Sequence, residues 1–82
     1  MADQSQQRVA WITGGSTGIG FAIVRELAQA GYLVVISARN EDGLRAACAE
    51  LVAAGAKADY VVMDVARRDE VEEGCRRILA RH

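Results

Sequence analysis

One glycine-rich stretch decides the fold of this chain of 82 residues: Thr13-Gly14-Gly15-Ser16-Thr17-Gly18-Ile19-Gly20. The apolar run 9–12 precedes it, and apolar residues at helical spacing follow it, namely Ile19, Ile23 and Leu27. The glycines therefore lie where a buried strand passes into a helix. Backbone N–H groups at the start of a helix are unpaired and carry the positive end of its dipole, so such a turn can bind a phosphate.

The composition is that of one small globular domain, with 51% hydrophobic and 26% charged residues. A net charge of −1 gives no reason to expect a nucleic-acid or anionic-membrane partner. The chain has no apolar run near the length of a membrane helix, about 20 residues, and its polar start lacks the apolar core of a signal peptide. We therefore expect a cytoplasmic protein, with residues 1–7 forming a disordered tail.

The two cysteines, Cys48 and Cys75, do not have the spacing of metal ligands. Both are expected on the apolar faces of helices, where a reduced and buried thiol is the usual state. The sequence therefore predicts no metal site.

The remaining chain alternates strands and helices. Consecutive apolar residues predict strands over residues 8–13, 33–36 and 60–63, each buried on both faces. A helix is expected over residues 18–30, and a helix should follow each of the other two strands. The order β-α-β-α-β-α with short connections predicts parallel strands in the order 3-2-1. This is a three-layer, Rossmann-like α/β half fold, with the first two helices on one face.

The two later helices carry their own signals. Asn40 can cap the second helix, which has the apolar stripe Leu44, Ala47, Cys48, Leu51 and Val52 and ends at Gly55. Asp69 and Glu72 have the spacing of a capping box for the third helix. Its predicted apolar stripe is Val71, Cys75, Ile78 and Leu79.

Three glycines of this stretch are expected to help bind a diphosphate. Gly14 lets the chain turn, Gly18 leaves the helix start bare, and Gly20 lets the helix pack closely on the strand. The N–H groups of residues 16–19 would donate to the phosphates, assisted by two hydroxyl groups. The candidate residues are thus Gly14, Ser16, Thr17, Gly18, Ile19 and Gly20, and a glycine-rich turn without a ligand is the alternative.

The spacing of these glycines is specific. Gly14-x-x-x-Gly18-x-Gly20, preceded by Thr13, is neither the general dinucleotide fingerprint nor a phosphate-binding loop that ends in Gly-Lys-Ser/Thr. It resembles the cofactor motif of the classical short-chain dehydrogenase/reductase family, and the resemblance covers nearly all of the chain after residue 7. It implies a nicotinamide dinucleotide cofactor and hydride exchange between an alcohol or carbonyl and that cofactor.

The end of the second predicted strand indicates which dinucleotide. An NAD site places an acid there for the ribose, and an NADP site places a cation there for the 2′-phosphate. Arg39 occupies this place, no acid precedes Glu41, and a guanidinium can donate two parallel hydrogen bonds to a phosphate. The resemblance likewise implies that NADPH is preferred over NADH. Asn40, as well as the Ser37 hydroxyl, could assist, although helix capping is the competing role for Asn40 and a solvated surface position that for Arg39.

Asp64 and Val65 follow the third predicted strand. The resemblance implies that the Asp64 side chain binds the adenine amino group and that the Val65 backbone assists. A carboxylate at the carboxyl end of a parallel strand also lies at the ligand-binding edge of the sheet. An aspartate that only shapes the loop is the alternative.

The family's catalytic Tyr-x-x-x-Lys pair does not occur in this sequence. The residues four positions after Tyr32 and Tyr60 are Ile36 and Asp64, and Lys57 is the one lysine. We therefore expect the truncated cofactor-binding half, residues 8–82, of an NADP(H)-dependent oxidoreductase, with no catalytic residues and no activity alone.

Two other functions are consistent with the sequence: a stand-alone or designed module that binds a dinucleotide without catalysis, and a structural protein that uses the fold for self-assembly. Three helices leave one sheet face partly bare and one edge strand open. Self-association through that face or edge is therefore expected.

Overall fold

The computed structural model describes residues 7–15 and 18–82. Three strands and three helices alternate along this part of the chain: β1 (Val9–Thr13), α1 (Gly18–Gln29), β2 (Leu33–Ala38), α2 (Glu41–Ala53), β3 (Ala58–Val62) and α3 (Arg68–Arg81). The strands are parallel and lie in the order β1-β2-β3, with β2 in the centre. The predicted α/β class, element order and strand order are confirmed.

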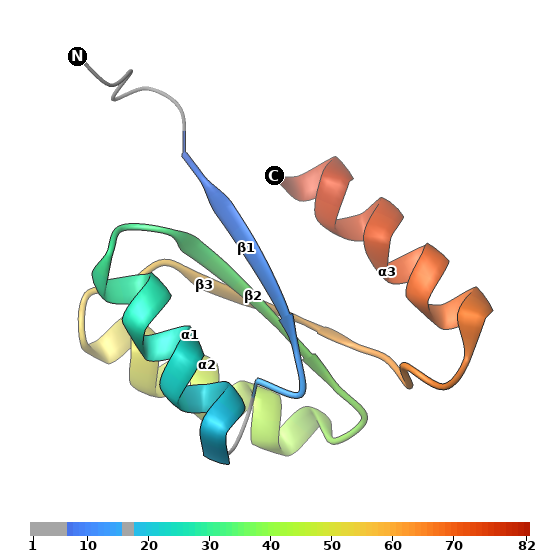
Figure 1. Cartoon of the computed structure of the whole chain (residues 1–82), viewed down its shortest axis with the longest axis horizontal. Helices are drawn as coiled ribbons and strands as arrows, with labels where there is room; N and C mark the ends of the chain where they lie inside the picture. The colour runs from blue at the N-terminus through green and yellow to red at the C-terminus, as the bar shows by residue number, and fades with distance from the viewer. Residues whose placement is uncertain (1–6, 16–17) are drawn as a thin grey trace.

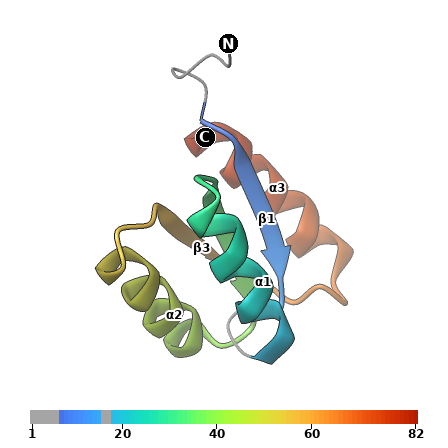
Figure 2. The ribbon, with the colours of Figure 1, turned by 60° about the vertical axis from the view of Figure 1, so that its left-hand side comes forward.

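The helices cover both faces of the sheet. Helices α1 and α2 lie on one face and α3 lies on the other (Figures 1 and 2). Successive residues of β2 alternate between the two layers, since Val34 and Ile36 join the core under α1 and α2, whereas Val35 joins the core under α3. The predicted three-layer arrangement is therefore present.

Helix α1 packs through a different set of residues from the one expected. Val24 is fully buried, and Phe21, Leu27 and Ala28 pack against the same core. Ile19 and Ile23 are 83% and 49% exposed, so the predicted stripe is wrong in two of its three members. The expected and the observed sets of apolar residues both have helical spacing. The sequence pattern alone therefore does not indicate which set faces the sheet.

Helix α3 begins one residue before Asp69, and its N-cap is Arg67, whose side chain makes no capping hydrogen bond. The predicted capping box of Asp69 and Glu72 is therefore wrong. Glu70 makes a different contact in the first turn, because its carboxylate accepts a hydrogen bond from the Asp64 N–H at 3.0 Å, three residues before the N-cap. This bond ties the first turn of α3 to the segment that leaves β3.

The buried face of α3 is narrow. Gly74 and Ile78 are buried against β3, whereas Cys75 and Leu79 are exposed, which corrects the expectation for both. On the exposed face Glu73 forms an ion pair with Arg77 at 3.5 Å. On the face of the sheet under α3, Val35 and Val61 are buried, whereas Val9 and Trp11 of β1 and Leu33 of β2 are only partly buried.

Polar contacts hold the amino-terminal edge of the sheet. Gln7, the last residue of the expected tail, donates to the Gly31 carbonyl at 2.8 Å and accepts from Lys57 at 3.0 Å. The end of α3 is held at β3, because Arg81 and His82 both lie 3.0 Å from the Asp59 carboxylate.

The carboxyl of Asp59 titrates below its ordinary range. Partial burial opposes its ionisation, but hydrogen bonds from His82, the Tyr60 N–H and Arg81 outweigh that effect and lower the pKa of Asp59. Asp59 therefore remains a charged partner for the end of α3 at neutral pH.

We predict that Gly74→Ala destabilises the fold. A Cβ atom at this position would collide with the buried Met63 side chain. Overpacking costs about 1–3 kcal/mol, and the better helix propensity of alanine returns about 1 kcal/mol, so we expect a net loss of about 1 kcal/mol in urea unfolding. The same change in a Met63→Val background should cost less. A Gly74→Ala protein more stable than the wild type would show that the contact with Met63 is not limiting.

Candidate functional site

The carboxyl ends of the three strands bring the predicted site residues to one edge of the sheet. Thr13 pairs in register with Ser37, and Ala38 pairs with Val62. Two backbone hydrogen bonds continue this alignment beyond the strands, from Gly14 N–H to the Ser37 carbonyl at 2.7 Å and from Met63 N–H to the Ala38 carbonyl at 3.0 Å. The segments that follow the strands, with the glycine loop, Arg39 and Asp64, therefore lie at one edge of the sheet. Figure 1 shows the three strands running in the same direction toward this edge.

The glycine loop adopts a backbone that side chains disfavour. Gly14 has φ +70° and Gly18 has φ +61°, in the left-handed region that glycine enters without steric cost. A Cβ atom at Gly14 would meet nothing within 4 Å, so conformation rather than crowding requires glycine there. The space at Gly18 is also open, which leaves the start of α1 accessible from outside.

Close packing requires glycine at two further positions. A Cβ atom at Gly20 would collide with the Gly14 carbonyl oxygen, so the first turn of α1 rests on the loop backbone. Gly15 is buried, and a Cβ atom there would lie 2.9 Å from both Ile36 and Val24. Gly15 was not among the predicted site residues, and its position next to Gly14 is the one signal that the sequence offers for it.

Two predicted residues of the loop, Ser16 and Thr17, lie outside the described residues. Ile19 follows in the first turn of α1 and is 83% exposed, beside the open start of the helix. The described part of the loop therefore presents an accessible helix N-terminus with an apolar side chain next to it.

Arg39 is exposed immediately after β2 and forms no ion pair with any residue that the structure describes. Its neighbour Asn40 caps α2, because its Oδ1 accepts hydrogen bonds from the N–H groups of Asp42 at 3.0 Å and Gly43 at 3.3 Å. The predicted capping role of Asn40 is confirmed. Ser37 does not offer its hydroxyl at this edge, because it is fully buried and accepts a hydrogen bond from Trp11.

Asp64 is half-buried in the turn that leaves β3. Its Oδ1 accepts a hydrogen bond from the Ala66 N–H at 2.9 Å, and its carbonyl accepts one from Arg67. Oδ1 thus shapes the loop, while Oδ2 has no protein partner in residues 7–15 and 18–82. Val65 is 58% exposed beside it.

The two cysteines have different surroundings. Burial, assisted by the negative charge of Asp59, raises the pKa of Cys48 to about 11, so its thiol stays protonated at neutral pH. Cys75 is exposed on α3. The part of the chain that the structure describes has no cluster of three metal-ligating side chains and no helix long and apolar enough to cross a membrane.

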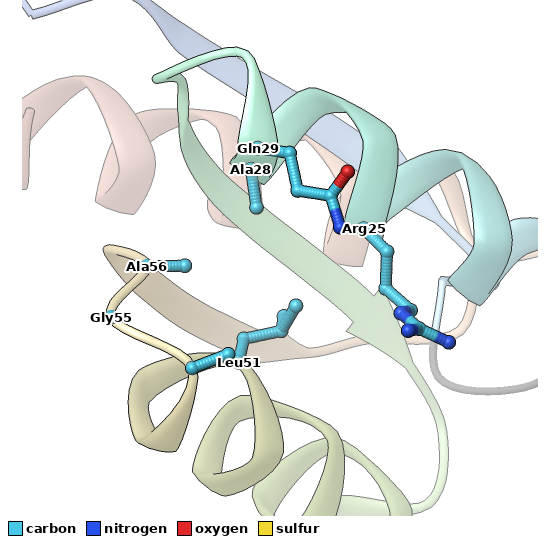
Figure 3. Close-up of a pocket in the computed structure, with 7 residues that line it drawn as sticks. Arg25, Ala28, Gln29, Leu51, Gly55 and Ala56 are labelled. Carbon is cyan, nitrogen blue, oxygen red and sulfur yellow. The ribbon is translucent and has the colours of Figure 1, made fainter.

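A cavity of about 290 Å³ lies elsewhere, between the ends of α1 and α2 (Figure 3). Apolar atoms of Ala28, Leu51 and Ala56 line it, together with the polar side chains of Arg25 and Gln29. Ala56 precedes β3, so this cavity lies toward the amino ends of the strands and contains none of the predicted site residues.

Comparison with known proteins identifies the class. The family model described as short chain dehydrogenase matches residues 8–82, and the chain belongs to that family. The chain is 43% identical over 72 residues to a putative ketoacyl reductase of Streptomyces coelicolor. The aligned part is 88% of this chain and 27% of that relative.

Two solved structures have the same fold. A metagenomic short-chain oxidoreductase in complex with NADP superposes with a TM-score of 0.87 at 41% identity, over 92% of this chain and 34% of that one. An alcohol dehydrogenase from Thermococcus sibiricus complexed with 5-hydroxy-NADP gives 0.86 at 40% identity, over 93% and 33% of the two chains. The chain thus spans about a third of the length of these two proteins.

We predict that the role of Asn40 in stability can be separated from any role in binding. Asn40→Ala removes the cap of α2 and should cost about 1 kcal/mol in urea unfolding, whereas Asn40→Ser keeps a capping oxygen and should cost little. Both variants should bind 2′,5′-ADP as the wild type does under conditions where they are folded. A loss of affinity in the stable Asn40→Ser variant would instead assign the Asn40 amide to the ligand.

Proposed function

We propose that residues 8–82 form the cofactor-binding half domain of an NADP(H)-dependent member of the family, holding the adenosine, 2′-phosphate and diphosphate of the cofactor. The observation that carries the proposal is the exposed guanidinium of Arg39 at the carboxyl end of β2, on the same edge as the glycine loop. The two crystallised relatives with NADP or 5-hydroxy-NADP bound support this choice of dinucleotide.

The glycine loop would hold the diphosphate. The start of α1 is open at Gly18, where a Cβ atom would stand in free space, and Gly14 and Gly20 bring the loop backbone and the helix close together. The unpaired N–H groups around Gly18 and Ile19 can donate to phosphate oxygens, and Ser16 and Thr17 would add hydroxyl donors. The positive end of the α1 dipole favours the negative charge of the ligand.

Arg39 would bind the 2′-phosphate through two parallel, charge-assisted hydrogen bonds, and this would favour NADPH over NADH. Asn40 uses its side-chain oxygen for the cap of α2, and we give its amide nitrogen no contact with the ligand. Oδ2 of Asp64, which has no partner among the residues that the structure describes, can accept a hydrogen bond from the adenine amino group, and the backbone of the exposed Val65 can assist.

The nicotinamide of the cofactor would supply or accept the hydride in the complete enzyme. The residues of this chain contribute binding and orientation, because its sequence contains no Tyr-x-x-x-Lys pair. We therefore propose carbonyl reduction or alcohol oxidation for a longer parent and no turnover by residues 1–82 alone. The alternative is a stand-alone or designed module that binds the dinucleotide without catalysis, and a Tyr-x-x-x-Lys sequence encoded downstream would distinguish the two.

We predict that Arg39→Ala weakens binding of 2′,5′-ADP by about 10- to 100-fold in a calorimetric titration, the loss expected for a hydrogen-bonded charge pair. Binding of 5′-AMP, which lacks the 2′-phosphate, should change little. Arg25→Ala is the matched control, because Arg25 is exposed beside the cavity between α1 and α2.

Equal losses for the two nucleotides in Arg39→Ala would contradict the role given to this residue. Failure of the wild-type protein to bind either nucleotide would contradict the proposed function itself.

We also infer that the chain of 82 residues self-associates through the partly covered sheet face or the open edge of β1. Within the described residues β1 has one neighbouring strand, and Ile19, Ile23 and Leu79 are exposed. Sedimentation velocity of residues 1–82 should show mass that increases with concentration, and Ile23→Glu should reduce it. A monomeric, cooperatively folded wild-type sample at all concentrations would refute this inference.

A further inference from the structure

Ser37 is the one buried polar side chain among the residues described, with an exposed fraction of 0%. A buried hydroxyl group is costly unless it is hydrogen-bonded. Its partner is the indole Nε1–H of Trp11, which donates to the Ser37 Oγ at 2.6 Å. Trp11 is the single tryptophan of the sequence. Each residue therefore satisfies a polar group of the other across β1 and β2.

The geometry of this bond is diagonal. Trp11 pairs in register with Val35, and Ser37 pairs with Thr13, so the indole reaches two residues along β2 toward the carboxyl edge of the sheet. Ser37 is also bound through its backbone, since its carbonyl accepts the Gly14 N–H at 2.7 Å. Ser37 therefore accepts two hydrogen bonds from this part of the chain. One comes from the Trp11 side chain of β1, and the other comes from the backbone N–H of Gly14, the first glycine of the loop.

Ser37 lies two residues before Arg39. On the other side, the next carbonyl of β2, that of Ala38, accepts a hydrogen bond from the Met63 N–H at 3.0 Å. The segment that carries Arg39 therefore leaves a strand end that is fixed to both of its neighbours. The side-chain bond from Trp11 adds a restraint that backbone pairing alone does not provide.

We propose that the Trp11–Ser37 hydrogen bond is a positioning contact that fixes the separation between the glycine loop and Arg39 and thereby sets selectivity for the 2′-phosphate. The proposal rests on the proposed function, in which one ligand contacts both the loop and Arg39. A ligand held at two points gains affinity when the two points are already correctly spaced. Trp11 and Ser37 themselves would not touch the ligand.

The bond can first be tested without a ligand. Because the sequence has one tryptophan, a single indole N–H resonance reports on it in nuclear magnetic resonance spectra. We expect slow hydrogen exchange of this indole in the wild-type protein and faster exchange in Ser37→Ala, since the acceptor is removed. Exchange in the wild type as fast as in the urea-unfolded chain would overturn the proposal.

The decisive comparison is between the wild type and the double variant Trp11→Phe/Ser37→Ala. Trp11→Phe alone leaves a buried hydroxyl without a donor and should lower the melting temperature by about 5–15 °C. The double variant has no unpaired group and should be at least as stable as that single variant. It should nevertheless prefer 2′,5′-ADP over 5′-AMP about tenfold less than the wild type, as expected if the hydrogen bonds of Arg39 are misaligned.

Leu51→Val, a change in the core under α1 and α2, controls for stability and should keep the wild-type preference. If the double variant does not fold, Ser37→Ala is the milder change and is expected to show the same loss of preference. Wild-type preference in a folded variant that lacks the bond would show that the contact is structural only. A wild-type protein that binds both nucleotides equally, or neither, would refute the proposed function and this proposal with it.

Discussion

The burial of β2 on both faces is the constraint on which the rest of the structure depends. Residues 34–37 are fully inaccessible to solvent, and burying each of the three apolar side chains among them, Val34, Val35 and Ile36, contributes about 1.5–3 kcal/mol. A central strand of this kind needs a neighbour at each edge and helices over each face, which β1, β3 and the three helices provide. Because the neighbouring strands are parallel to β2, the carboxyl ends of all three strands lie at one edge of the sheet. The packing that buries β2 therefore also brings the residues of the candidate site together.

The sequence predicts the order of the elements better than their orientation. Consecutive apolar residues and short connections determined the three parallel strands, and Asn40 capped α2 as expected. In α1, however, two sets of apolar residues have helical spacing, and the sheet buries the set around Val24 rather than the one that contains Ile23. The start of α3 differs for a related reason, because the partner of Glu70 is the Asp64 N–H of a loop, which no local pattern reveals.

For the candidate site too, some features could be predicted from the sequence and others could not. The spacing of Gly14, Gly18 and Gly20 predicted both a turn and a close approach, and the backbone angles and contacts of these glycines agree. The prediction that the Ser37 hydroxyl assists at the ligand edge was wrong. Side chains alternate along β2, and that of Ser37 points to Trp11 rather than to the edge. Which side chains reach the edge depends on the pleat of a strand buried on both sides, and an apolar run without alternation carries no information about that pleat.

Gly15 links this loop directly to the interior. Its backbone lies against the side chains of Val24 and Ile36, so the turn proposed to bind the ligand is also part of the main core. During evolution these three positions are not free to change one by one. A larger residue in place of Gly15 becomes acceptable when Val24 or Ile36 is replaced by a smaller one, so sequence variation at the loop should be correlated with side-chain volume in α1 and β2.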